Sequence, residues 1–230
     1  MDLEKFNLPR YLATQPLFSH MSEDERERLA QGCQLRRVAR GSHLFRAGDA
    51  CNEFHVTVLG QVKLFAVSPS GVEKVIELCG PGQSFAEAVM FMAAPYAVSA
   101  QTLTDSLILT IDKAVVLREI NANPDFSLRM LAGLSRRLHS LVKDVQAYAL
   151  DSGVQRVIGY LLSDGNHQGQ ADAVTVTLPV SKAVIASRLS LTPEYFSRVL
   201  HELESAALIR VDKRNIHIPN PTHLASYQPK

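Results

Sequence analysis

The sequence predicts an α+β fold in which a small β-barrel or jelly roll is followed by one long helix and a helical C-terminal region. Three observations support this prediction. Between residues 35 and 111, short β-rich runs are broken by glycines about every 8–12 residues, as in small antiparallel barrels. After Pro124, apolar residues recur at helical spacing. From residue 154 onward, helical stretches with strong start signals precede a β-hairpin pattern.

The composition is that of a globular protein with two domains. The chain has 230 residues, of which 46% are hydrophobic and 20% charged. We expect a cytoplasmic protein without membrane contact, because no apolar run reaches the roughly 18 residues of a transmembrane helix and no signal-peptide pattern opens the chain. Cys33, Cys51 and Cys79 are too far apart for a CxxC site. Since the net charge is only +1, a nucleic-acid surface would have to be local.

The long helix carries a seam of apolar and aromatic residues at steps of three and four. Its members are Leu131, Leu134, Leu138, Leu141, Val145 and Tyr148. This is the a/d spacing of a coiled coil. A helix of roughly 25 residues is nearly 40 Å long, which is too long to bury on a small barrel. We therefore predict a homodimer held along this seam; the alternative is an amphipathic helix packed on its own domain.

Two helices joined by a short turn are predicted near the C-terminus. Ser181 is a suitable N-cap for a helix over residues 182–189, and Thr192 caps the next helix with Pro193 at its first position. Two helices with so short a connection form a helix-turn-helix. Residues 209–218 then alternate between apolar and polar around a turn, which predicts a β-hairpin wing.

The second helix of this pair carries the pattern that points to double-stranded DNA. Glu194, Ser197 and Arg198 stand at positions i, i+3 and i+4 and so project together. Arginine can bind guanine, glutamate can accept from an exocyclic amine, and serine permits close approach. A solvated helix face is the alternative. The predicted DNA contacts are Glu194, Ser197, Arg198, Thr192, Lys182, Lys213 and Arg214.

From about residue 18 to residue 218, the order of these parts resembles the CRP/FNR family of bacterial transcription regulators. Residues 45–49 and 60–63 resemble the glycine-bearing hairpins of its cyclic-nucleotide-binding fold, and residues 82–88 resemble its phosphate-binding cassette. Glu194-x-x-Ser197-Arg198 matches the E-x-x-S-R motif of the FNR branch. The resemblance implies a homodimeric regulator that reads a TTGAT-N4-ATCAA inverted repeat and has RNA polymerase as a partner.

The resemblance divides the chain into three parts: a sensory cyclic-nucleotide-binding-like β-roll over 1–123, a dimerisation helix over 124–150 and a winged helix-turn-helix domain over 151–230. No nucleophile–base pair, metal-ligand cluster or P-loop is present, so we do not expect an enzyme. The competing hypothesis is a cyclic-nucleotide-binding scaffold that acts through protein contacts.

The sensor departs from the cyclic-nucleotide binders of the family. They carry an arginine shortly after the cassette, whereas residues 92–100 contain no basic residue. Because a buried phosphate needs a cationic partner, we do not expect cyclic AMP or GMP as the effector. Iron–sulfur members need clustered N-terminal cysteines, and none precedes Cys33. We therefore expect no iron–sulfur cluster.

Residues 85–92, with Pro95, resemble the DNR-type regulators, which implies nitric oxide sensing through haem. The predicted effector pocket consists of Gly82, Phe85, Ala86, Glu87, Met90 and Met92. A lining of Met and Phe suits a flat apolar cofactor, although such stretches are more often plain core, and the alternative for Glu87 is a structural ion pair. Haem would need an axial ligand. His20 is put forward for this role, with His43, His55 and His139 as further candidates by position alone; an ordinary surface or core role is the alternative for each.

Overall fold

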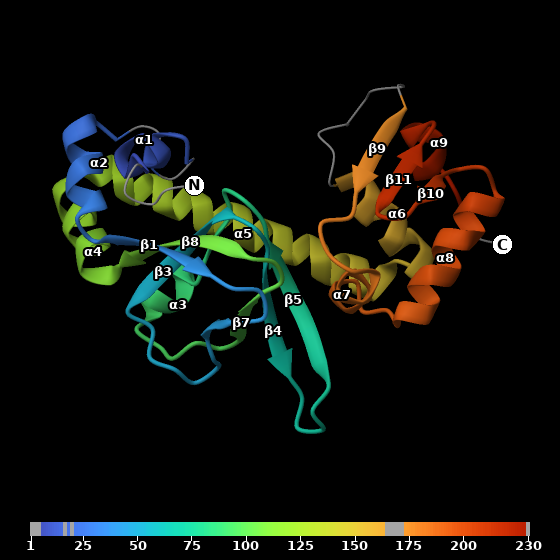
Figure 1. Cartoon of the computed structure of the whole chain (residues 1–230), viewed down its shortest axis with the longest axis horizontal. Helices are drawn as coiled ribbons and strands as arrows, with labels where there is room; N and C mark the ends of the chain where they lie inside the picture. The colour runs from blue at the N-terminus through green and yellow to red at the C-terminus, as the bar shows by residue number, and fades with distance from the viewer. Residues whose placement is uncertain (1–5, 16–17, 19–20, 164–172, 229–230) are drawn as a thin grey trace. The chain divides into compact units, whose positions relative to one another are not determined.

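A computed structural model describes residues 6–15, 18, 21–163 and 173–228 (Figure 1). The chain divides into two compact units. The first contains residues 1–70 and 76–140, and the second contains residues 71–75 and 141–230. No helix in the described ranges is long and apolar enough to cross a membrane.

The first unit is built on two four-stranded antiparallel sheets. One has the order β1 (Cys33–Val38), β8 (Ser106–Asp112), β3 (Glu53–Leu59) and β6 (Ser84–Phe85). The other has the order β2 (His43–Phe45), β7 (Ser99–Thr102), β4 (Val62–Val67) and β5 (Glu73–Cys79), of which residues 73–75 belong to the second unit. Phe54, Ile108 and Leu64, from both sheets, belong to one buried apolar cluster. The predicted β-roll is thus confirmed.

The turn from β3 to β4 shows why glycine punctuates this unit. Gly60 has φ +91°, a left-handed conformation that other residues rarely adopt. A Cβ atom at this position would lie 2.3 Å from Ser106 Oγ and 2.9 Å from the Asp105 carbonyl oxygen. The tight connection between the strands therefore requires glycine here.

Five helices accompany these sheets: α1 (Leu8–Ala13), α2 (Glu23–Ala30), α3 (Glu87–Met92), α4 (Lys113–Ala122) and α5 (Pro124–Leu150). At the start of α2, the Glu25 amide donates to Ser22 Oγ at 3.3 Å and the Ser22 amide donates to the Glu25 carboxylate at 2.6 Å, which completes a capping box. Helix α5 has 27 residues and is drawn as one continuous helix in Figure 1. It passes from the first unit into the second after residue 140.

The second unit combines helices with a three-stranded antiparallel sheet of order β10-β11-β9. Its elements are α6 (Gly153–Ser163), β9 (Val174–Thr177), α7 (Lys182–Arg188), α8 (Pro193–Ser205), β10 (Arg210–Asp212), β11 (Asn215–Ile218) and α9 (Pro221–Ala225). Ser181 and Thr192 cap α7 and α8 as predicted. Ser190, in the turn between these helices, has φ 57°. The left-handed conformation that glycine usually supplies is therefore present without glycine. The helix-turn-helix and its hairpin wing are confirmed.

Candidate DNA-reading surface and sensor cavity

The outer face of α8 carries the three residues predicted to read DNA. Glu194, Ser197 and Arg198 are all exposed, whereas Phe196 and Leu203 of the same helix are fully buried. The buried face fixes the rotation of α8 about its axis, so the three polar side chains share one exposed face in its first turns. This is the presentation that major-groove reading requires.

His201 extends this face by one turn, and sequence reasoning missed it. It is exposed and stands four residues after Ser197 and three after Arg198. At these spacings, residues on a helix lie on the same side. The spacing alone could have identified His201, because it continues the pattern of the three predicted residues.

The other predicted DNA contacts differ in whether their polar groups are already hydrogen-bonded within the protein. Thr192 Oγ1 accepts from the Tyr195 amide at 3.2 Å, so its hydroxyl forms the helix cap. Lys182 is half-buried at the start of α7, and Lys213 is exposed in the hairpin turn. Arg214 is exposed, but its Nε donates to the Leu178 carbonyl at 3.1 Å. Of the two predicted contacts in the wing, the structure thus leaves Lys213 the freer one.

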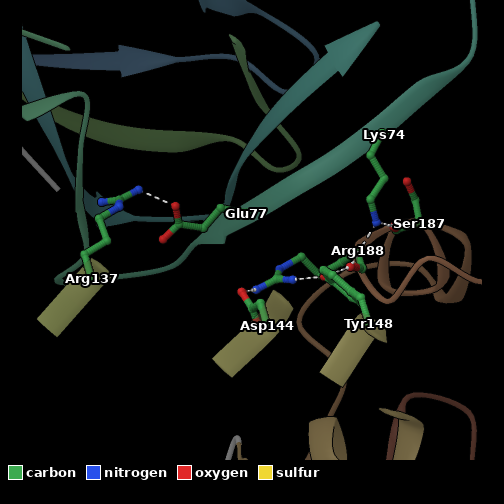
Figure 2. A network of polar contacts seen from close by, with 7 residues as sticks. All are labelled: Lys74, Glu77, Arg137, Asp144, Tyr148, Ser187 and Arg188. Carbon is green, nitrogen blue, oxygen red and sulfur yellow. Dashed lines mark hydrogen bonds and ion pairs between the residues drawn. The ribbon is translucent and has the colours of Figure 1, made fainter. Parts of the chain in front are cut away.

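The C-terminal end of α7, which leads into the turn before α8, is held by a polar network (Figure 2). Lys74 donates to the carbonyls of Ser187 and Arg188, the second at 3.2 Å. Tyr148 donates to the Arg188 carbonyl at 2.6 Å, and the Arg188 guanidinium pairs with Asp144 at 2.5 Å. Burial, together with the nearby positive charges, lowers the pKa of Lys74 to about 8.

The exposed side of α5 carries a continuous, largely apolar stripe. Its members follow one another at steps of three and four: Leu128, Leu131, Ser135, Leu138, Val142, Val145 and Ala149. Leu131, Leu138 and Val145 are 59%, 64% and 64% exposed, which is unusual for large apolar side chains and is typical of a surface that a second copy covers. We name this set the α5 stripe.

The α5 stripe shares only part of the predicted seam. Leu131, Leu138 and Val145 belong to both, and Leu141 is 41% exposed beside the stripe. Leu134 instead lines a cavity in the first unit, and Tyr148 is engaged in the α7 network. The predicted seam and the α5 stripe are thus two heptad frames that share three residues, and contacts within the chain turn Leu134 and Tyr148 of the predicted frame away from the exposed side.

A cavity of about 330 Å³ lies in the first unit beside the segment that resembles the phosphate cassette. It is lined by Glu77, Gly82, Gln83, Ser84, Glu87, Met130, Gly133, Leu134, Arg136, Arg137 and Ser140. These residues come from β5, the loop into β6, β6 itself, α3 and α5. The cavity therefore brings together segments that lie more than 40 residues apart in the sequence.

Arg137 dominates the electrostatics of this cavity. It donates to the Ser84 carbonyl at 2.7 Å and pairs with Glu77, and its Nη1 lies 3.5 Å from the Glu87 carboxylate (Figure 2 shows the Glu77 pair). Burial acts against the charge on Arg137, but the two carboxylates outweigh it and raise the pKa of the guanidinium. The prediction of a sensor without a cation considered only the segment after the cassette. It therefore missed Arg137, which α5 supplies.

The predicted pocket residues divide between cavity and core. Gly82 and Glu87 line the cavity, and Glu87 is 6% exposed. Phe85 and Met90 are fully buried in the apolar core, and Met92 is 73% exposed. Ala86 precedes α3 in a left-handed conformation with φ 74°. Core packing, the alternative considered for the Met and Phe residues, accounts for two of them.

Of the candidate haem ligands, the three that the structure describes, His43, His55 and His139, do not line the cavity. His20 lies outside the described residues, and His43 and His139 are exposed. His55 is fully buried, with its ring 5.5 Å from that of Phe45 and 5.2 Å from that of Phe85. In the part of the chain that the structure describes, no cluster of three or more His, Cys, Asp or Glu residues could hold a metal.

Comparisons with known proteins agree with this architecture. A family model described as "Cyclic nucleotide-binding domain" matches residues 35–123, and one described as "Crp-like helix-turn-helix domain" matches residues 155–227. A probable transcriptional regulator of Lacticaseibacillus casei is 27% identical over 94% of this chain and 96% of its own length.

Two solved structures are more similar in sequence. A putative cyclic nucleotide binding protein from Ruegeria pomeroyi is 32% identical over 94% of this chain and 95% of its own, with a TM-score of 0.63. DNR from Pseudomonas aeruginosa is 31% identical over 95% of this chain and 96% of its own, with a TM-score of 0.52. The family models place both functional parts, the β-roll and the helix-turn-helix, in the order seen here. This chain therefore belongs to the CRP/FNR family of DNA-binding transcription regulators, which are not enzymes.

Proposed function

We propose that this regulator reads an FNR-like inverted repeat, TTGAT-N4-ATCAA, with one α8 helix from each subunit of a homodimer. The observation that carries the proposal is the shared exposure of Glu194, Ser197 and Arg198 in the first turns of α8. Arg198 is suited to bind O6 and N7 of the guanine in TTGAT, and Glu194 to accept from an exocyclic amine. RNA polymerase is the partner that this role implies.

The α5 stripe supports the dimeric part of the proposal. A coiled coil along two copies of this stripe relates the two reading helices by a two-fold axis. A two-fold protein matches an inverted repeat whose half-sites lie about one DNA turn apart. The symmetry of the proposed site therefore follows from the symmetry of the proposed dimer.

The test is the substitution Arg198→Ala, measured by fluorescence anisotropy on the TTGAT repeat and on a repeat with adenine in place of that guanine. We expect affinity for the TTGAT repeat to fall about 10- to 100-fold for each half-site, because alanine cannot form the two hydrogen bonds to guanine. The variant should also lose the preference for guanine over adenine at this position.

Arg210→Ala is the matched control, since Arg210 is an exposed arginine on β10. An arginine that binds only phosphate contributes equally on all sequences, so its removal should weaken binding uniformly. It should also lower the slope of log affinity against log salt concentration by about one. If Arg198→Ala weakens binding equally on the TTGAT repeat and on scrambled DNA, base reading by this residue is contradicted.

For the sensor, haem-mediated response to nitric oxide stays a proposal, supported by the resemblance to DNR-type regulators. The described lining of the cavity offers Met130 but no histidine, so the described residues do not by themselves fit a histidine-ligated haem. An absorption spectrum after haem addition, with and without nitric oxide, tests the proposal. A titration that matches a non-haem control protein would remove haem.

The competing sensor hypothesis is a cyclic-nucleotide-binding scaffold that acts through protein contacts. In the cavity, Arg137 is already paired with Glu77 and lies close to Glu87, so a cyclic phosphate would face two carboxylates. Titration of the protein with cyclic AMP by calorimetry distinguishes the scaffold hypothesis from the haem hypothesis. We expect no heat of binding, and tight binding without any DNA affinity would favour the scaffold.

A further inference from the structure

Tyr195 lies at the edge of the reading face of α8, and its aromatic ring contacts Arg198. The Arg198 guanidinium carbon is 5.2 Å from the centre of the Tyr195 ring. This is within the roughly 6 Å at which a cation over an aromatic face is attracted to it. The ring thus limits where the arginine side chain can go.

The edge of the ring is itself held in place by the start of α6. A Cβ atom built on Gly153, at the start of α6, would lie 2.4 Å from Tyr195 Cε1 and 3.0 Å from its hydroxyl oxygen. The ring edge therefore lies directly against the Gly153 backbone, where only glycine leaves room. The Tyr195 amide also donates to Thr192 Oγ1, so the residue is fixed at both backbone and ring.

A cation–π contact leaves the hydrogen-bonding groups of the arginine free. The ring attracts the positive charge and accepts none of the five N–H donors of the guanidinium in a conventional hydrogen bond. Among the described residues, no hydrogen bond from Arg198 to another side chain or carbonyl is present. Arg198 is therefore restrained without using the donors that guanine would accept.

We propose that Tyr195, seated on Gly153, is a positioning residue that holds Arg198 in the orientation needed to read guanine. An unrestrained arginine loses side-chain entropy when it binds, and a side chain that is already ordered loses less. The proposal rests on the proposed role of Arg198. It adds a residue that contributes to specificity without itself needing to touch a base.

The experiment compares Tyr195→Leu with Tyr195→Phe in the full-length protein, on the TTGAT repeat and on scrambled DNA. Leucine removes the ring, and phenylalanine keeps it without the hydroxyl. We expect Tyr195→Leu to weaken binding to the repeat about 5- to 30-fold, because each subunit then lacks the cation–ring interaction. Binding to scrambled DNA should not change, and Tyr195→Phe should restore near-normal affinity.

A double-mutant cycle with Arg198→Ala separates positioning from a general structural role. In the Arg198→Ala background, Tyr195→Leu should have no further effect on DNA binding. An equal loss in both backgrounds, or on both DNAs, would overturn the proposal, and tighter binding by Tyr195→Leu would overturn it by showing that the ring sequesters the arginine.

Gly153→Ala provides an independent variant, because the added Cβ must displace the ring. It should weaken specific binding in the wild type but not in the Tyr195→Leu background, and a loss in both would contradict the proposed contact between Gly153 and the ring.

The experiments also distinguish failure of this inference from failure of the proposed function. If Arg198→Ala has no specific effect, the proposed function fails, whereas a specific Arg198 effect without a Tyr195 effect overturns only this inference.

Discussion

Glutamate in place of both Leu138 and Val142 is expected to convert the dimer into monomers and abolish binding to the inverted repeat. The two side chains are 64% and 48% exposed on one face of α5. In a coiled coil each would be buried against the partner helix, where an apolar side chain contributes roughly 1.5–3 kcal/mol. Because each change occurs twice in a dimer, the dissociation constant should rise at least about 1,000-fold.

The matched control is the pair His139→Glu and Lys143→Glu, one residue further along at each position. Both side chains are exposed and lie outside the α5 stripe, so this variant should remain dimeric. Sedimentation velocity gives the mass, and anisotropy gives DNA affinity. A stripe variant that stays dimeric at micromolar concentration would show that the contact between subunits lies elsewhere.

The same surface offers a test between the two heptad frames. Ser135 is a polar member of the α5 stripe, and the frame that contains Leu134 and Leu141 excludes it. Ser135→Leu should therefore tighten the dimer, because it adds an apolar side chain to the seam. An unchanged dissociation constant would favour the other frame.

Acid is expected to destabilise the first unit through His55. The side chain is fully buried, its Nδ1 lies 3.0 Å from Thr110 Oγ1, and its Nε2 has no hydrogen-bond partner among the described residues. Burial, followed by the positive charge of Arg36, lowers the pKa of His55 to about 3. The nearest carboxylate, that of half-buried Glu53, is 3.8 Å from Nε2 and does not reverse the shift.

The sign of the effect follows from this lowered pKa. Between about pH 3 and pH 6.5, the unfolded chain holds a proton on His55 that the folded chain does not. Stability is therefore fully present above pH 6.5 and falls as the pH is lowered toward 3, with a slope of roughly 1 kcal/mol per pH unit for each subunit.

Urea unfolding between pH 4.5 and pH 7 measures this slope. His55→Gln removes the titrating group and keeps an amide that can bond to Thr110, so the slope should become shallower. His43→Gln, at an exposed histidine, is the control and should leave it unchanged. If wild type and His55→Gln lose stability in parallel, other groups govern the acid sensitivity.

Elements with local signals could be predicted from the sequence. Ser181, Thr192 and Pro193 determine where α7 and α8 begin, since caps act within one turn. The buried face of α8 then fixes which residues are exposed. For this reason helical spacing alone could place the reading trio on one face, although the continuation of that face to His201 was missed.

Features that depend on long-range contacts could not be predicted in the same way. The pairing of Arg137 with Glu77 joins residues 60 positions apart, and neither side chain stands in a motif. The heptad frame is ambiguous in the sequence because Leu131, Leu138 and Val145 fit both frames. Only the contacts of Leu134 and Tyr148 within the chain decide between them.

The network at the end of α7 has a consequence for how the DNA-binding part folds. With seven residues, α7 is too short to be stable as an isolated helix. The carbonyls at its end accept from Lys74, Tyr148 and Arg156, and the first of these is separated from Arg188 by 114 positions. Contacts between such distant segments form slowly, because a long loop must close first. We therefore expect α7 to become ordered late in folding, and its amides to be among the first in the second unit to exchange with solvent when Lys74 is removed.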